Sequence, residues 1–115
     1  MRKLPVAALA GGGQFARNSM ELLKRNGVEP IIRVRTQSFS LIIDAVRTGG
    51  VAAFVPAPAA LEFPQDQFAI IELSGIDRLG RKLFMVYEPT ASSLRPVART
   101  LGAKIAQVCA ANQRL

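Results

Sequence analysis

The sequence has no histidine, no tryptophan, one tyrosine and a single cysteine, Cys109. A lone cysteine cannot form an intramolecular disulfide, which fits the reducing cytoplasm and predicts a cytoplasmic protein. Zinc and copper sites are not expected, because histidine and cysteine are the usual ligands of both metals. The missing histidine also excludes a Ser-His or Cys-His catalytic pair.

Acidic residues are few, and they show no pairing along the chain that suggests acid–base catalysis. No catalytic residue, no metal and no cofactor is therefore predicted. We expect that the protein is not an enzyme.

Long hydrophobic runs are lacking as well. The longest, Val51 to Leu61, contains Pro56 and Pro58 and cannot span a bilayer. The stretch from Leu4 to Ala10 is too short for a convincing signal peptide and contains Pro5. No membrane partner is expected.

Positive charge is in excess, with 15 Lys and Arg against 8 Asp and Glu, a formal net charge of +7. Such an excess suits nucleic acid or anionic ligands. The basic residues are scattered, however, and are not interleaved with aromatic residues. This pattern favours a solvated surface over direct contact with DNA.

The first half of this 115-residue, single-domain chain alternates between strands and helices. The predicted strands are Leu4–Leu9, Ile31–Arg35 and Val51–Val55, and the predicted helices are Phe15–Asn26 and Phe39–Val46. A β-α-β-α-β order with short connections predicts a parallel sheet with right-handed crossovers. Ligands bind such sheets outside the carboxyl ends of the strands, which here are residues 11–14, 36–39 and 55–56.

The second half predicts two further strands, Phe68–Leu73 and Lys82–Tyr87, which are expected to form an antiparallel pair. A final helix follows, with an apolar stripe that contains Val97, Leu101, Ile105 and Val108. The fold class is therefore α/β.

Two polar segments are candidates for ligand binding. Gly11-Gly12-Gly13-Gln14 follows a strand but has neither a Gly-Lys-Ser/Thr nor a GxGxxG motif, so a flexible or anion-tolerant turn is the better interpretation. Thr36-Gln37-Ser38 either caps the next helix or holds a small polar or anionic ligand, and both roles are compatible. Phe39 and Phe54 are more typical of core residues than of ligand platforms.

The block from Val34 to Pro56 resembles part of the substrate-binding domain of LysR-type transcriptional regulators. It contains a strand that ends in a polar segment, a helix that ends shortly before Gly49-Gly50, and a strand of small apolar residues that ends in proline. The strands and helices on either side follow the same order, so the resemblance covers nearly the whole chain.

This resemblance implies a domain like a periplasmic binding protein, with two lobes and a small metabolite in the cleft between them. Residues 1–67 would be the second lobe, and residues 68–115 the crossover strands and C-terminal helix that belong to the first lobe. The implied ligand-binding residues are Thr36, Gln37, Ser38, Phe39, Gly12 and Pro56, with Pro56 near the hinge.

The family's helix-turn-helix and most of its first lobe have no counterpart in these residues, so we interpret the chain as a truncated effector-sensing domain that does not itself contact DNA. Two alternatives stay open: a structural or oligomerisation module, and a small-ligand binder like a solute-binding protein. A lone lobe would expose apolar surface on its last strand and helix, so a homo-oligomer is expected.

Overall fold

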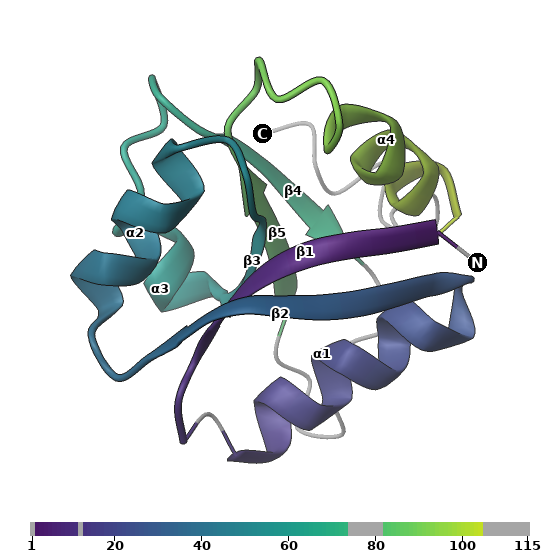
Figure 1. Ribbon diagram of the computed structural model, residues 1–115, viewed down its shortest axis with the longest axis horizontal. Helices are drawn as coiled ribbons and strands as arrows, with labels where there is room; N and C mark the ends of the chain where they lie inside the picture. Colours follow the sequence, from purple (N-terminus) through teal and green to yellow (C-terminus); the bar gives the residue numbers. More distant parts are fainter. Residues whose placement is uncertain (1, 12, 74–81, 105–115) are drawn as a thin grey trace.

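The computed structural model describes residues 2–11, 13–73 and 82–104 (Figure 1). Its helices and strands are β1 (Arg2–Leu9), α1 (Gly13–Arg25), β2 (Val28–Thr36), α2 (Phe39–Arg47), β3 (Ala53–Pro56), α3 (Ala57–Ala60), β4 (Ala69–Leu73), β5 (Leu83–Tyr87) and α4 (Arg95–Lys104). The α/β class is confirmed.

The first two strands form the predicted parallel pair. β1 and β2 are in register from Arg2 opposite Val28 to Leu9 opposite Thr36, with a shift between Val6 and Ala7. The crossover helix α1 ends where Gly27 takes a positive φ of 80°, and the Gly27 N–H donates to the Lys24 carbonyl at 3.1 Å. The sequence prediction of a parallel β-α-β unit is therefore correct.

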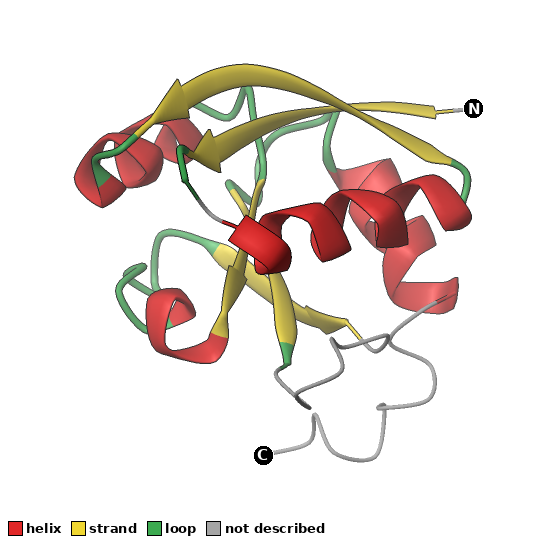
Figure 2. Ribbon diagram, turned by 90° about the horizontal axis from the view of Figure 1, so that it is seen from below, coloured by secondary structure: helices red, strands yellow, loops and turns green. Residues whose placement is uncertain are grey.

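The third strand departs from the expected parallel sheet. Ala52, the residue before β3, meets Val6 of β1 at an isolated parallel bridge, where the Ala7 N–H donates to the Ala52 carbonyl at 2.9 Å. Beyond that bridge β3 pairs antiparallel with β5 instead, from Ala53 opposite Val86 to Pro56 opposite Leu83. Figure 2 shows the result: the β1–β2 pair crosses the other strands at a steep angle, with α1 lying in front.

The second sheet has the strand order β3-β5-β4. β4 and β5 are antiparallel, from Ala69 opposite Tyr87 to Leu73 opposite Leu83, which confirms the predicted pair. The predicted connector from Ser74 to Gly80 lies outside the described residues. β5 is the central strand of this sheet, and its pairing with β3 ties the second half of the chain to the first.

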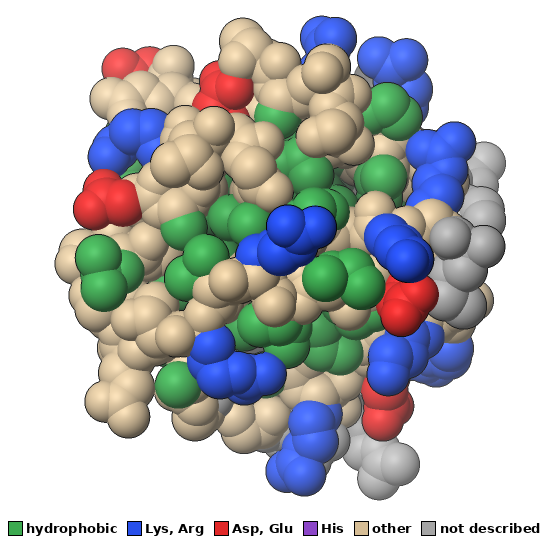
Figure 3. All heavy atoms as spheres, viewed as in Figure 1, with side chains coloured by type: hydrophobic (Ala, Val, Ile, Leu, Met, Phe, Trp, Pro, Cys, Tyr) green, Lys and Arg blue, Asp and Glu red, His purple; other side chains and the backbone are tan. Residues whose placement is uncertain are grey.

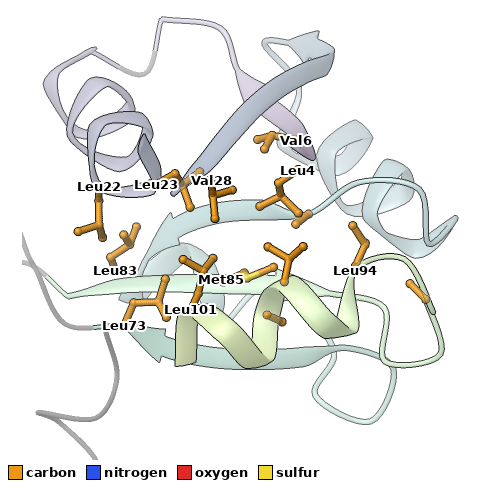
Figure 4. Packing of buried hydrophobic residues seen from close by; sticks show 14 residues of the cluster. Leu4, Val6, Leu22, Leu23, Val28, Leu73, Leu83, Met85, Leu94 and Leu101 are labelled. Carbon is orange, nitrogen blue, oxygen red and sulfur yellow. The ribbon is translucent and has the colours of Figure 1, made fainter. Parts of the chain in front are cut away.

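Helices cover both faces of the strands, and each face has its own apolar cluster. The α1–α4 cluster contains Leu4, Val6, Leu22, Leu23, Val28, Ala52, Leu73, Leu83, Met85, Ala91, Leu94, Val97, Ala98 and Leu101 (Figure 4). The α2–α3 cluster contains Ala7, Ile42, Val46, Val51, Ala53, Val55, Ala60, Phe63, Phe68 and Val86. Neighbours in one strand, such as Val6 and Ala7, belong to opposite clusters because strand side chains alternate between faces.

The expectation of an exposed apolar last strand and helix is wrong for the described residues. Val97 and Leu101 are 5% and 0% exposed, and Met85 on β5 is fully buried. The reason is that α4 packs onto the same cluster as Leu4 and Leu23 from the first half of the chain (Figure 4). Ile105 and Val108 lie outside the described residues. The boundary between residues 1–67 and 68–115 refers to the complete two-lobed family architecture and stays a prediction.

Candidate functional site

The carboxyl ends of β1 and β2 lie together, with the start of α2 directly after them. The Ala10 N–H, just beyond β1, donates to the carbonyl of Thr36, the last residue of β2, at 2.8 Å. Pro56 ends β3 and stands directly before α3. β1 and β2 thus end at a common edge, which is the location at which α/β proteins of this kind bind ligands.

Ser38 caps α2. Its backbone is extended (φ −96°, ψ 118°), and its hydroxyl accepts a hydrogen bond from the Leu41 N–H at 3.4 Å. The same hydroxyl lies 2.9 Å from the Ser40 hydroxyl. The capping role predicted for this segment is confirmed.

Thr36 supports the same turn, since its hydroxyl accepts a hydrogen bond from the Ser38 N–H at 3.1 Å. Gln37 between them is exposed to solvent. The first-turn N–H groups of Phe39 and Ser40 have no acceptor within the helix, as at any helix start. The segment therefore presents the Gln37 amide, two hydroxyls and backbone donors at one edge.

Gly12 lies outside the described residues. Its neighbours Gly11 and Gly13 both adopt positive φ, 78° and 64°, and Gly13 begins α1. Left-handed backbone at Gly11 and Gly13 is typical of turns, whereas the role predicted for Gly12 in ligand binding stays untested.

An apolar cavity of about 260 Å³ lies beside this edge. Its walls come from β1, β3, α1 and the start of α2, with Ala59 of α3. It brings together two of the predicted site residues, Phe39 and Pro56, but its lining does not include Thr36, Gln37 or Ser38. Its one polar lining side chain is that of Ser19, which is 3% exposed and has an interaction partner.

The cavity exists because β1 and β3 separate after Ala52. Its lining includes Val6 from the α1–α4 cluster and Ala7 from the α2–α3 cluster, so it reaches both faces of the strands. Small side chains, including Ala8, Ala53 and Ala59, leave the volume open. The sequence predicts Phe54 as a core residue and Ala8 and Ala53 as strand residues. The runs of alanine in these two strands are the signal from which a cavity could have been predicted.

A second hollow, of about 450 Å³, lies between α1 and the ends of β1 and β2. We call it the basic groove, because Arg17, Lys24 and Arg35 line it, with Glu21 as the opposing charge. All four side chains are exposed. Within the described part of the chain, none of the four takes part in an ion pair or a side-chain hydrogen bond.

Elsewhere the positive charge is dispersed. On the face shown in Figure 3, Lys and Arg side chains are spread over the surface, with hydrophobic side chains between them. The described residues contain no group of His, Cys, Asp and Glu side chains suited to hold a metal ion. Among the described helices, none combines the length and the hydropathy that a membrane crossing requires.

Comparison with known proteins gives a family. The family model described as "LysR substrate binding domain" matches residues 2–110. Searches of curated proteins and of solved structures found no match. Because the match covers nearly the whole chain and agrees with the α/β architecture and the strand ends described above, the chain belongs to the LysR substrate-binding domain family, the effector-binding domains of LysR-type regulators.

Proposed function

We propose that this domain binds a small-molecule effector at the carboxyl ends of its β-α-β strands and thereby controls a LysR-type transcriptional regulator. Its membership of the family supports the effector-binding role. The observation that supports the location is the hydrogen bond between Ala10 and Thr36, which holds the ends of β1 and β2 together beside the start of α2.

The proposed site has a polar wall and an apolar wall. Thr36, Gln37 and Ser38 supply hydroxyl, amide and backbone donors for a polar or anionic group, helped by the partial positive charge at the start of α2. Phe39 and Pro56 supply apolar contacts in the lining of the cavity. We keep Gly12 in the proposed site because it stands between β1 and α1 in the sequence.

Control of transcription would follow from coupled equilibria. An effector that binds one arrangement of lobes or subunits more tightly than another shifts the population toward the arrangement that it prefers. We assign DNA contact to a helix-turn-helix outside these residues, because the basic side chains here are dispersed (Figure 3). The proposal includes no catalytic step, in keeping with a sequence that has no histidine.

We also propose that the domain works in the cytoplasm as a homo-oligomer. β2 is nine residues long and pairs, within the described residues, with β1 alone, so its outer edge is available to another strand. Ile32 on this strand is a large apolar side chain that is 39% exposed. This edge is the surface that we propose for self-association.

The site can be tested with a thermal-shift screen of small carboxylates and aromatic acids. A bound effector raises the melting temperature, because it binds the folded state only. We expect Thr36→Ala and Ser38→Ala each to weaken effector binding about tenfold, since each removes a hydrogen-bonding group from the polar wall. Ser92→Ala, at an exposed position on another part of the surface, is the matched control and should bind as the unaltered protein does.

Two outcomes would contradict this proposal. If both variants respond like the control, the site is wrongly placed. If no member of the screen binds and the protein still self-associates, a structural or oligomerisation module becomes the better interpretation.

A further inference from the structure

The apolar cavity and the basic groove adjoin. Ala8, Leu9, Ala16 and Met20 line both of them, so the two hollows are direct neighbours. The two hollows differ in character: one is lined by apolar side chains, and the other carries three cationic side chains at the surface.

The cavity selects for an uncharged group. It contains no charged lining residue, and a charge transferred into such surroundings is strongly disfavoured. Its volume of about 260 Å³ exceeds the roughly 150 Å³ of an engineered apolar cavity that binds benzene. A single ring or a short alkyl chain therefore fits.

The basic groove selects for an anion. Arg17 and Lys24 approach it from α1 and Arg35 from β2, against the one carboxylate of Glu21. Because these three cations have no ion-pair partner among the described residues, an incoming anion displaces no existing bridge. Guanidinium groups bind carboxylates with two parallel hydrogen bonds, which makes Arg17 and Arg35 suited to a carboxylate.

We propose that the effector is an amphipathic carboxylate, whose ring or alkyl chain fills the cavity between β1 and β3 and whose carboxylate lies beside Arg17 and Arg35. This inference rests on the proposed function, since it names the chemical class that the effector site accepts. Arg35 immediately precedes Thr36 at the end of β2, but the lining of the basic groove does not include Thr36, Gln37 or Ser38, so the carboxylate is a contact separate from the polar wall.

The cavity is tested with a series of straight-chain carboxylates: acetate, butanoate and hexanoate, measured by isothermal titration calorimetry on the full 115-residue chain. Each buried methylene group should lower the dissociation constant about fourfold. Ala59→Leu places a larger side chain in the cavity wall and should abolish this gain. Ala57→Leu, on the same short helix but exposed and outside the lining, should keep it.

The carboxylate position is tested with charge-neutral variants. Arg17→Gln and Arg35→Gln should each weaken hexanoate binding by about 1.5-fold to fivefold, the range expected of exposed ion pairs. They should leave binding of the uncharged 1-hexanol unchanged. Arg33→Gln, exposed on the same strand but outside the groove, is the control and should change neither. Denaturation curves of all variants verify that each one folds.

Several results would overturn the inference. Equal affinity for acetate and hexanoate would show that the alkyl chain does not bind in the cavity. The same conclusion would follow if Ala59→Leu kept the increase in affinity with chain length. If Arg35→Gln and Arg33→Gln changed hexanoate binding equally, the carboxylate would not lie in the basic groove. Failure of the proposed function would give a different result. The variants Thr36→Ala and Ser38→Ala test the polar wall, and their effect does not depend on the chain length of the carboxylate.

Discussion

Ser38 serves both the stability of α2 and the proposed effector site. Its hydroxyl accepts the hydrogen bond of the Leu41 N–H and lies within hydrogen-bonding distance of the Ser40 hydroxyl. Substitutions here therefore change two properties at once, the free energy of unfolding and effector binding. A useful test separates them.

We expect Ser38→Ala to lower the free energy of unfolding by about 0.5–1 kcal/mol, because the helix loses its cap. Ser38→Asp should restore most of that loss, since aspartate caps equally well and its charge suits a helix N-terminus. It should also repel an anionic effector. Urea denaturation measures the first property and calorimetric titration the second. Equal stability of Ser38→Ala and the unaltered protein would contradict the capping role.

At the scale of the elements, α1 depends on how it ends. The helix occupies residues Gly13–Arg25, and Gly27 then turns the chain into β2 with φ at 80°. A Cβ at this position would meet nothing within 4 Å, so any cost of a side chain comes from the backbone conformation alone. Left-handed backbone is costly for residues other than glycine.

Gly27→Ala should therefore lower the free energy of unfolding by about 1 kcal/mol. Gly50→Ala is the matched control: Gly50 does not have a positive φ, and its added Cβ would make an ordinary contact of 3.6 Å with the Thr48 hydroxyl. The control should be neutral or slightly stabilising, because alanine restricts the unfolded chain. Urea denaturation measures the free energy of unfolding of both variants. If both substitutions changed it equally, a side chain at Gly27 would not strain the turn between α1 and β2.

At the scale of the whole molecule, the surface available for self-association is not the one that the sequence suggested. The stripe of α4 is buried at Val97 and Leu101, which leaves the outer edge of β2 as the proposed interface. Two β2 strands related by a two-fold axis would present the same edge to each other, which makes the interface self-complementary, as a symmetric dimer requires.

We expect light scattering to give the mass of a dimer and Ile32→Lys to shift it toward the monomer, because lysine on an edge strand opposes strand addition. Leu61→Lys is the control: Leu61 is 75% exposed and lies in the turn after α3, away from β2. A monomeric unaltered protein at all concentrations would refute self-association. If Ile32→Lys and Leu61→Lys both dissociated the dimer to the same extent, the β2 edge would not be the surface of self-association.

The local sequence was sufficient to predict most of the elements and part of the site. Helices and strands follow from the spacing of apolar residues, and the cap at Ser38 and the turn at Gly27 follow from residue types that favour those backbone conformations. The polar edge at Thr36–Ser38 was predictable for the same reason, because parallel strands bring their carboxyl ends together.

Only the tertiary structure decided the pairing of β3, the burial of α4 and the position of the cavity. Each depends on residues far apart in the chain: β3 turns from β1 to β5 after Ala52, and Leu101 packs with Leu4 and Leu23. Apolar periodicity shows which face of an element is buried but not which partner buries it. The cavity is a property of neither strand by itself, since it arises from the separation of β1 and β3 between small side chains whose volumes do not fill the gap.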